Sequence, residues 1–299
     1  MITDQQKKDI TAKLRKFVGN YPSQKQACQS LDDISEATII QMLNNKWGSI
    51  SERKWITVAK QIGVMGAKGT KVYVETRVSR EVYGLLNTSR RHGAMICVTG
   101  RAGLGKSMAA QAYANASLTD TFYVQCRTDW GIKDMFKALL KAMRKDDVYG
   151  NLTHMIDEVV KEVKRIKAPL IILDEIDKLL DKPGASTVLR HLVTLYNELN
   201  GYCGISLTCT NTIENFIKRG VERQKIGFEE IYSRIGSGYL RLNKATDHDI
   251  KMLCAAYGIT EEKEVYTIIN EIKGLKGDLR RFDANVVKVE TFNKKEEAA

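Results

Sequence analysis

Four short apolar runs divide the middle of the chain into alternating segments. They cover residues 94–99, 121–126, 169–175 and 204–211. Apolar runs of this length, bounded by polar and glycine-containing stretches, are typical of buried strands. Between them, apolar residues recur at helical spacing, as in residues 133–144 and 156–166. This alternation predicts an α/β domain in which helices flank a mostly parallel sheet in three layers, α/β/α.

Residues 1 to about 65 have a different pattern, which predicts a separate all-α domain. Apolar residues recur at helical spacing over residues 10–18, and the pattern then stops at a Gly-Asn-Tyr-Pro sequence. Ser23 is a favourable N-cap for a second helix. A third helix is expected over residues 35–44, and a fourth amphipathic segment follows Trp47. The glycine-rich residues 63–69 form the predicted linker to the α/β domain.

The second and third of these helices, joined by a tight break, match the helix-turn-helix arrangement, with residues 35–45 as the recognition helix. The alternative is a four-helix interaction module that never touches DNA. For the DNA-binding arrangement we expect the major groove to be faced by Ser35, Glu36, Thr38 and Gln41, and the core by Ala37, Ile40 and Leu43.

The charge balance adds a class of partner to this picture. The 299 residues include 47 Lys and Arg against 36 Asp and Glu, a net charge of +11. Such an excess favours a polyanionic partner, with nucleic acid the first candidate and an acidic membrane surface the second. Much of the excess falls within residues 1–80, which modestly favours DNA binding by the N-terminal domain.

Cysteine and histidine usage narrows the chemistry and the compartment. Six cysteines without a Cys-x-x-Cys pair and four dispersed histidines form no zinc-ligand set. Several cysteines lie in apolar runs, where a free thiol usually acts as a small core residue. We expect a cytoplasmic protein, because the chain has no signal peptide and no apolar run near the roughly 20 residues that span a membrane.

Directly after the first apolar run, residues 100–107 read Gly-Arg-Ala-Gly-Leu-Gly-Lys-Ser and match the phosphate-loop pattern at every fixed position. Strong helix formers follow from Met108. In such a loop, glycines let backbone N–H groups close around phosphate oxygens, and the helix N-terminus adds its positive end. We expect Lys106 to reach the β- and γ-phosphates and the Ser107 hydroxyl to bind Mg²⁺.

The ends of two later strands carry candidates for the rest of this chemistry. The third apolar run ends in Asp174, a candidate Mg²⁺ ligand, and Glu175, which we expect to polarise the attacking water. The alternative for this acidic pair is capping of the next helix. Asn211 follows the fourth run, where its side chain either orients that water or caps a helix. Asp177, beyond the strand end, is expected to be structural.

Together these segments resemble the AAA+ ATPases, with residues 100–107 similar to Walker A, 170–175 to Walker B and 208–211 to sensor 1. The resemblance implies an α/β AAA+ core over residues 66–242 and a helical lid and tail over residues 243–299, with lid helices at 247–257, 261–272 and 278–289. It implies an arginine finger at Arg234, with Arg219 and Arg223 as alternatives, and a sensor 2 arginine at Arg280, with Arg281 in reserve. The implied ATP-binding residues are Gly100, Arg101, Ala102, Gly103, Leu104, Gly105, Lys106, Ser107, Met108 and Arg280, and the implied Mg²⁺ ligands are Ser107 and Asp174.

The layout of residues 74–107, preceded by a repressor-like helical domain, is similar to the transposition ATPases of the bacteriophage Mu B type. This similarity implies an ATPase that forms ATP-dependent filaments on duplex DNA, delivers that DNA to a transposase and stimulates transposition, with hydrolysis taking the filament apart. Phosphate contacts are expected from Arg127, Lys133 and Lys137. Two alternatives remain: a helicase-loader or replication-initiator ATPase, and a nucleotide-switched helix-turn-helix transcription regulator.

Overall fold

The computed structural model describes residues 4–19, 21, 23–31, 34–62, 73–117, 119–145, 147–181, 183–257, 259, 261–274, 277–282 and 284–285. Contacts divide the chain into two compact units, residues 1–72 and 73–299, which are described separately. The predicted linker at residues 63–69 and the charged tail at 293–299 lie outside the described residues. No helix in the described part of the chain is both long and apolar enough to cross a bilayer.

The N-terminal unit is built from helices around a small core of its own. Its helices are α1 (Asp4–Gly19), α2 (Gln24–Gln29), α3 (Glu36–Leu43) and α4 (Glu52–Gln61). The prediction that Ser23 caps the second helix is confirmed, because its Oγ accepts a hydrogen bond from the backbone N–H of Gln26 at 3.2 Å. Trp55 is buried at the centre of this core, and Trp47 packs edge-on against it.

Three of the placements predicted for α3 are wrong, those of Thr38, Ala37 and Ile40. Thr38 is 3% exposed, and its hydroxyl bonds to Ser35 Oγ at 2.9 Å and accepts from Lys54 Nζ. Ile39 and Met42 face the core, whereas Ala37 and Ile40 are exposed. The apolar sequence Thr-Ile-Ile-Gln-Met-Leu fits two helical faces about equally well, and packing around Trp55 selects the one that turns Thr38 inward. Gln41 remains half-buried at the edge of the outer face.

The C-terminal unit contains one parallel sheet with the strand order β2-β3-β4-β1-β5. Four of its strands lie within the predicted runs and are β1 (Met95–Thr99), β2 (Thr121–Gln125), β3 (Leu170–Asp174) and β4 (Gly204–Cys209). The fifth, β5 (Tyr239–Arg241), was not predicted; it pairs with β1 from Cys97 to Thr99. The carboxyl ends of β1, β3 and β4 therefore lie next to one another at one edge of the sheet.

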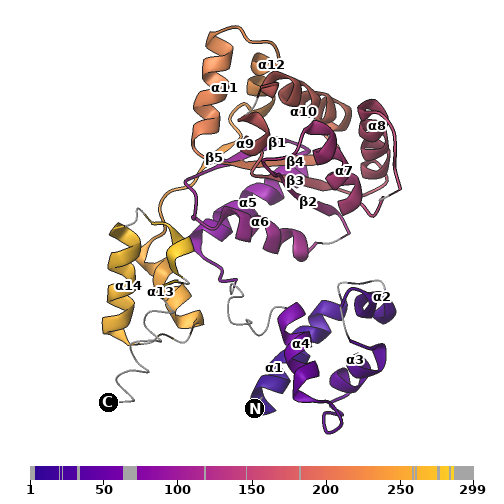
Figure 1. The fold of residues 1–299 in the computed structure, drawn as a ribbon, viewed down its shortest axis with the longest axis vertical. Coiled ribbons are helices and arrows are strands. Elements are labelled where there is room, and N and C mark those ends of the chain that lie inside the picture. Colours follow the sequence, from indigo (N-terminus) through magenta and orange to yellow (C-terminus); the bar gives the residue numbers. More distant parts are fainter. Residues whose placement is uncertain are drawn as a thin grey trace. The chain divides into compact units, whose positions relative to one another are not determined.

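Helices cover both faces of this sheet, so the predicted three-layer α/β/α architecture is confirmed (Figure 1). Ile96 and Val98 of β1 pack on one face with helices α5 (Arg77–His92) and α6 (Lys106–Asn115). Cys97, between them, points to the other face and its larger core. That core is formed with helices α7 (Ile132–Ala142), α8 (Leu152–Val163), α9 (Asp177–Leu180), α10 (Ala185–Leu199), α11 (Thr212–Glu222) and α12 (Phe228–Ile235). All six cysteines of the chain are buried and unpaired.

The predicted lid is represented by α13 (Asp247–Ala256), α14 (Glu262–Gly274) and a short 3₁₀ helix, η1 (Leu279–Arg281). The third predicted helix, over residues 278–289, is thus a 3₁₀ turn at its start, and residues 286–289 lie outside the described part. Asp249 fastens α13 to the beginning of α5, because its fully buried carboxylate accepts from the backbone N–H of Arg77 at 2.7 Å.

Candidate nucleotide-binding site

The phosphate loop joins β1 to α6 in the order that the motif requires. Gly103 and Gly105 have φ values of +82° and +89°, a left-handed conformation that glycine adopts without strain. Lys106 opens α6 and is 8% exposed; its Nζ donates to the carbonyl oxygens of Gly100 at 2.7 Å and Arg101 at 2.8 Å. Burial lowers the pKa of Lys106, although the Asp174 carboxylate opposes this shift. The loop lysine is therefore held within its own loop.

The other side chains predicted for the loop differ in how far they are exposed to solvent. Arg101 and Ala102 are exposed, and Met108 is half-buried in the first turn of α6. Leu104 is 1% exposed and packs in the core under α5 and α6, so it anchors the loop from below.

Asp174 ends β3 beside the first turn of α6. Its carboxylate is fully buried and accepts hydrogen bonds from Tyr123 Oη at 2.8 Å, from the backbone N–H of Glu175 at 3.0 Å and from the Ser107 hydroxyl. Burial raises the pKa of Asp174, and the hydrogen bonds from Ser107 and Tyr123 oppose that shift. The structure thus brings together the two oxygen-bearing side chains predicted to hold Mg²⁺.

Glu175 is held in place by two neighbours. Its backbone is left-handed, with φ +55°, which is uncommon for a residue with a side chain. Gln125 Nε2, at the end of β2, donates to Glu175 Oε2 at 3.0 Å, and Lys178 forms an ion pair with the same oxygen. Burial raises the pKa of Glu175, but these contacts outweigh it and leave the pKa below its usual value. The carboxylate is therefore ionised and tied at one oxygen.

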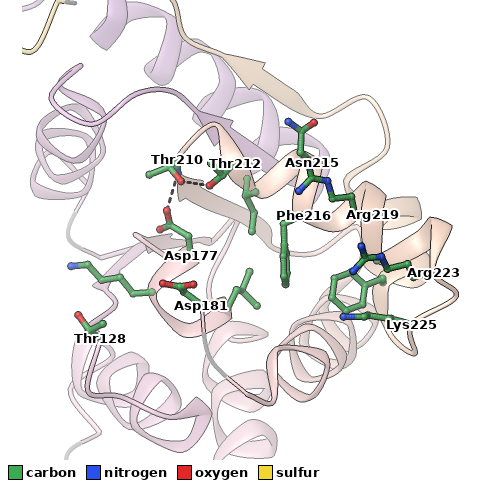
Figure 2. Close-up of a pocket in the computed structure, with 15 residues that line it drawn as sticks. Thr128, Asp177, Asp181, Thr210, Thr212, Asn215, Phe216, Arg219, Arg223 and Lys225 are labelled. Atoms are coloured by element: carbon green, nitrogen blue, oxygen red, sulfur yellow. Dashed lines mark hydrogen bonds between the residues drawn. The ribbon is translucent and has the colours of Figure 1, made fainter. Parts of the chain in front are cut away.

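The capping alternatives are wrong for both strand ends. The N-cap of α9 is Ile176, without a side-chain bond, and the side chain of Asn211 makes no capping bond to α11. Asn211 is exposed just beyond β4. Asp177 instead has the structural contact, because it accepts from the backbone N–H of Thr210 at 3.1 Å and ties the end of β3 to the end of β4 (Figure 2).

The lid reaches this site through the segment before η1. The backbone N–H of Leu279 donates to Gly103 O at 2.9 Å, and the Asp278 carboxyl lies directly against Gly103. Arg280 is exposed on η1, close enough for its charge to lower the pKa of both Lys106 and Glu175. The predicted sensor 2 arginine therefore lies near the phosphate loop.

The groups gathered at this site fit a nucleoside triphosphate with Mg²⁺. The loop presents backbone N–H groups in a left-handed turn at the start of a helix, an arrangement suited to phosphate oxygens. Ser107 and Asp174 supply hydroxyl and carboxylate oxygens, which Mg²⁺ prefers. Lys106 would hold the β- and γ-phosphates, and Ser107 with Asp174 would hold the metal, which neutralises charge on the phosphates when bound.

The remaining predicted residues lie outside this cluster. Arg234, on α12, donates to Asn197 Oδ1 of α10 at 2.9 Å. Arg127 is bound by both carboxylate oxygens of Asp129, at 2.9 and 3.0 Å, and lies over the Trp130 ring. Its charge is thus compensated within the chain. The predicted DNA contacts Lys133 and Lys137 are exposed on α7, whereas Thr38 is excluded by its burial.

Three residues that contact Asp174 or Glu175, or lie beside them, were not predicted, and neither was Lys141, which lies outside the site on α7. Tyr123 and Gln125 alternate along β2 beside β3, in a register that brings Gln125 opposite Asp174. Lys178 follows Glu175 by three residues, a spacing that could have indicated the ion pair. Lys141 continues the exposed row of Lys133 and Lys137 at intervals of four residues. Only the last two signals could have been read from the sequence.

A parallel sheet with helices on both faces and a phosphate loop after β1 defines a P-loop α/β nucleotide-binding domain, here with the AAA+ fold. Residues 89–215 match the family described as the AAA domain. That match spans the phosphate loop, β3 and β4. No curated protein sequence matches the chain.

The chain is similar to several solved structures at low sequence identity. The Aeropyrum pernix ORC1 protein in complex with DNA superposes with a TM-score of 0.55 and 18% identity over 74% of this chain. The chain spans 62% of that protein's length. CDC6P from Pyrobaculum aerophilum (TM-score 0.48, 13% identity, 70% of this chain and 58% of that one) is also similar. The replication initiator DnaA bound to AMPPCP and single-stranded DNA is similar as well, with a TM-score of 0.49 and 16% identity over 78% of this chain and 68% of that one.

Proposed function

We propose that the chain binds and hydrolyses ATP with Mg²⁺. The observation that carries this proposal is the meeting of Lys106, Ser107, Asp174 and Glu175 at the carboxyl edge of the sheet. In this arrangement Lys106 binds the terminal phosphates, and Ser107 and Asp174 hold the metal. Glu175 orients and polarises the water that attacks the γ-phosphate, which requires an ionised carboxylate, consistent with its lowered pKa.

Substitution of Glu175 tests the hydrolytic step. Glu175→Gln keeps the size of the side chain but removes the base, so we expect ATP binding to persist while kcat falls about 10²- to 10⁴-fold. The matched control is Glu158→Gln, an exposed helical glutamate on α8 that pairs with Lys161, and it should turn over normally. Unchanged turnover in Glu175→Gln would remove Glu175 from this role.

We further propose that the protein assembles on duplex DNA as an ATP-dependent filament and delivers that DNA to a transposase. The support is the arrangement of the chain: an all-α unit precedes an AAA+ core with the sequence layout of the transposition ATPases. The exposed Arg234 would complete the nucleotide site of the next subunit, with Asn211 orienting the water in its own. A head-to-tail contact of this kind that does not close produces a helix.

The DNA contact of the core is assigned to a row of lysines on α7. Lys133, Lys137 and Lys141 are exposed, follow one another by about 6 Å along the helix, and have no acidic partner among the described residues. Three phosphate contacts release about three counterions, so their joint replacement by alanine should reduce the slope of log K against log salt by about 2.7. The control, Lys161→Ala, removes a lysine already paired with Glu158. An unchanged slope in the triple variant would contradict this assignment.

Electron microscopy with long duplex DNA tests the assembly. We expect filaments with ATP and none with ADP or without nucleotide, and we expect Glu175→Gln to give filaments that persist. Isolated particles in every condition would contradict filament formation.

The likeness of the fold to ORC1 supports a second candidate, a replication-initiator or helicase-loader ATPase. This candidate predicts closed rings or monomers and a preference for single-stranded DNA. Competition between single-stranded and duplex DNA of equal length, measured by anisotropy at one salt concentration, separates the two candidates.

A further inference from the structure

A cavity of about 630 Å³ lies on the side of α9 and α11, next to the nucleotide site (Figure 2). One wall is formed by α9 and the residues that follow β4, including Asp177, Lys178 and Thr210. The other wall is formed by α11 and the segment before α12. The volume lies within the range of pockets that bind small molecules and short peptide segments. None of the roles proposed above uses this cavity as a binding site.

The α11 wall is positively charged and uncompensated. Arg219, Arg223 and Lys225 line it and are exposed, and none has an acidic partner in the described part of the chain (Figure 2). Of the two glutamates of α11, Glu214 is already bound by Lys218 at 2.7 Å and Arg241 at 2.7 Å, and Glu222 forms no ion pair with these three side chains. The cavity therefore favours an anionic occupant.

The surface between the two walls is apolar. Phe216, Ile213 and Phe228 line the cavity, with the Phe216 ring 5.2 Å from that of Phe228. A duplex is convex and rigid and makes its non-specific contacts through phosphates, so it gains nothing from apolar side chains inside a concavity. A peptide that carries both acidic and apolar side chains uses both surfaces. Asp181, on the α9 wall, can accept from a peptide N–H.

Two contacts join the α9 wall to the nucleotide site. Lys178 lines the cavity and also forms the ion pair with Glu175. Asp177 lines it and accepts from Thr210 at the end of β4. The Lys178 side chain is 37% exposed and ends a flexible four-carbon stem, so it can turn from Glu175 to an anion in the cavity without movement of the backbone.

We propose that this cavity binds an acidic peptide segment, and that the bound acid draws Lys178 away from Glu175 and so activates hydrolysis. The binding site stands on the cavity alone, whereas the activation rests on the proposed ATPase function. In the free protein Lys178 and Gln125 both contact Oε2 of Glu175. With the peptide bound, Lys178 no longer draws charge from the carboxylate, whereas Gln125 still holds it in position beside the attacking water. Lys178 is thus a positioning residue, which acts through Glu175.

Binding is tested on the full chain with the probe acetyl-Glu-Glu-Phe-Glu-Leu-amide, followed by NMR or calorimetry. The matched control peptide, acetyl-Gln-Gln-Phe-Gln-Leu-amide, has the same shape without charge and should bind at least about tenfold more weakly, because each shielded ion pair contributes a few-fold. Arg219→Ala/Arg223→Ala should weaken the acidic probe by about tenfold. Lys218→Ala, on the same helix and paired with Glu214, should leave its affinity unchanged.

Three results would overturn the site. They are equal affinity for the two peptides, equal loss in the Lys218→Ala control, and no binding of the acidic probe at about 5 mM, well above typical pocket affinities. A change in sedimentation of Arg219→Ala/Arg223→Ala without a change in probe binding would also overturn it, because the cationic wall would then face a second copy of this chain.

The coupling is tested by steady-state hydrolysis with and without the acidic probe. We expect the probe to raise kcat several-fold with KM unchanged, and Lys178→Met to show the raised kcat without the probe and no further response. Unchanged kcat with the probe, or unchanged kcat in Lys178→Met, would overturn the coupling.

The two proposals fail in different ways. If the probe binds as expected but ATP is not hydrolysed in any condition, the proposed ATPase function is overturned and the peptide site stands. If ATP is hydrolysed but the probe does not bind, the peptide site is overturned and the ATPase stands.

Discussion

Replacement of Gly103 by alanine tests how the lid and the phosphate loop depend on each other. The φ of +82° at Gly103 costs a residue with a side chain about 1–2 kcal/mol. An added Cβ would also overlap the Asp278 carboxyl and lie 3.2 Å from Asp278 Cα, so the lid segment must shift and lose the bond from Leu279 N to Gly103 O, worth about 1 kcal/mol. The free loop of the variant relaxes out of this conformation, and ATP binding has to restore it. The sum of about 2–3 kcal/mol therefore predicts ATP binding about 30- to 150-fold weaker.

Titration with a fluorescent ATP analogue measures this loss, and two further variants locate its origin. Gly84→Ala, within α5, meets no atom within 4 Å, so nucleotide affinity should stay the same while helix propensity raises stability by about 0.5–1 kcal/mol. The double variant Gly103→Ala/Asp278→Ala lacks the clash with the carboxyl but keeps the backbone strain. Its ATP affinity should therefore be about fivefold higher than that of Gly103→Ala, which corresponds to the free energy of the lid contact. ATP affinity of Gly103→Ala within about threefold of the wild type would refute this reasoning.

Two other substitutions probe charges described above. Lys106→Ala removes charge-assisted bonds to two phosphates, so calorimetry should show ATP affinity reduced by about 100-fold or more, and filaments should be lost with it; retained affinity would contradict the role of Lys106. Glu214 has a pKa lowered from 4.5 to about 2 by Arg241 and Lys218, so its stabilisation is complete above pH 4.5 and disappears as the pH falls toward 2. Glu214→Gln should therefore lower the free energy of unfolding by about 1 kcal/mol at pH 7, and this difference from the wild type should shrink as the pH falls toward 2. Thermal unfolding measures it, and a difference that does not change with pH would exclude the ion pairs.

The nucleotide site was predictable from the sequence where its residues are close along the chain. The loop from Gly100 to Ser107 has fixed chemistry at fixed spacing, and Asp174 follows an apolar run long enough to be a buried strand. Contacts across the sheet were not predictable in this way. Gln125 reaches Glu175 only because β2 pairs in parallel with β3, and a strand pairing of this kind leaves no local signal in either strand.

Two features were missed because the local pattern was too short or ambiguous. The three residues of β5 are too few to form an apolar run. The strand follows α12 and is defined only by its pairing with β1, which is distant in the sequence. In α3 consecutive apolar residues permit two faces, and only the tertiary packing around Trp55 decides that Thr38 is inside. The fold class thus follows from periodicity, whereas the orientation of a short helix depends on its neighbours.

The central place of β1 in the sheet has a consequence for how the protein is made. β1 carries the phosphate loop, yet its neighbours are β4 and β5, which begin at Gly204 and Tyr239. On the ribosome, the 96 residues from 108 to 203 are synthesised after the loop before either edge of its strand can pair. Parallel pairing over such separations is slow and leaves apolar strands exposed meanwhile. A nascent chain stopped before Gly204 should therefore be unable to retain ATP, even though its whole phosphate loop has already been translated.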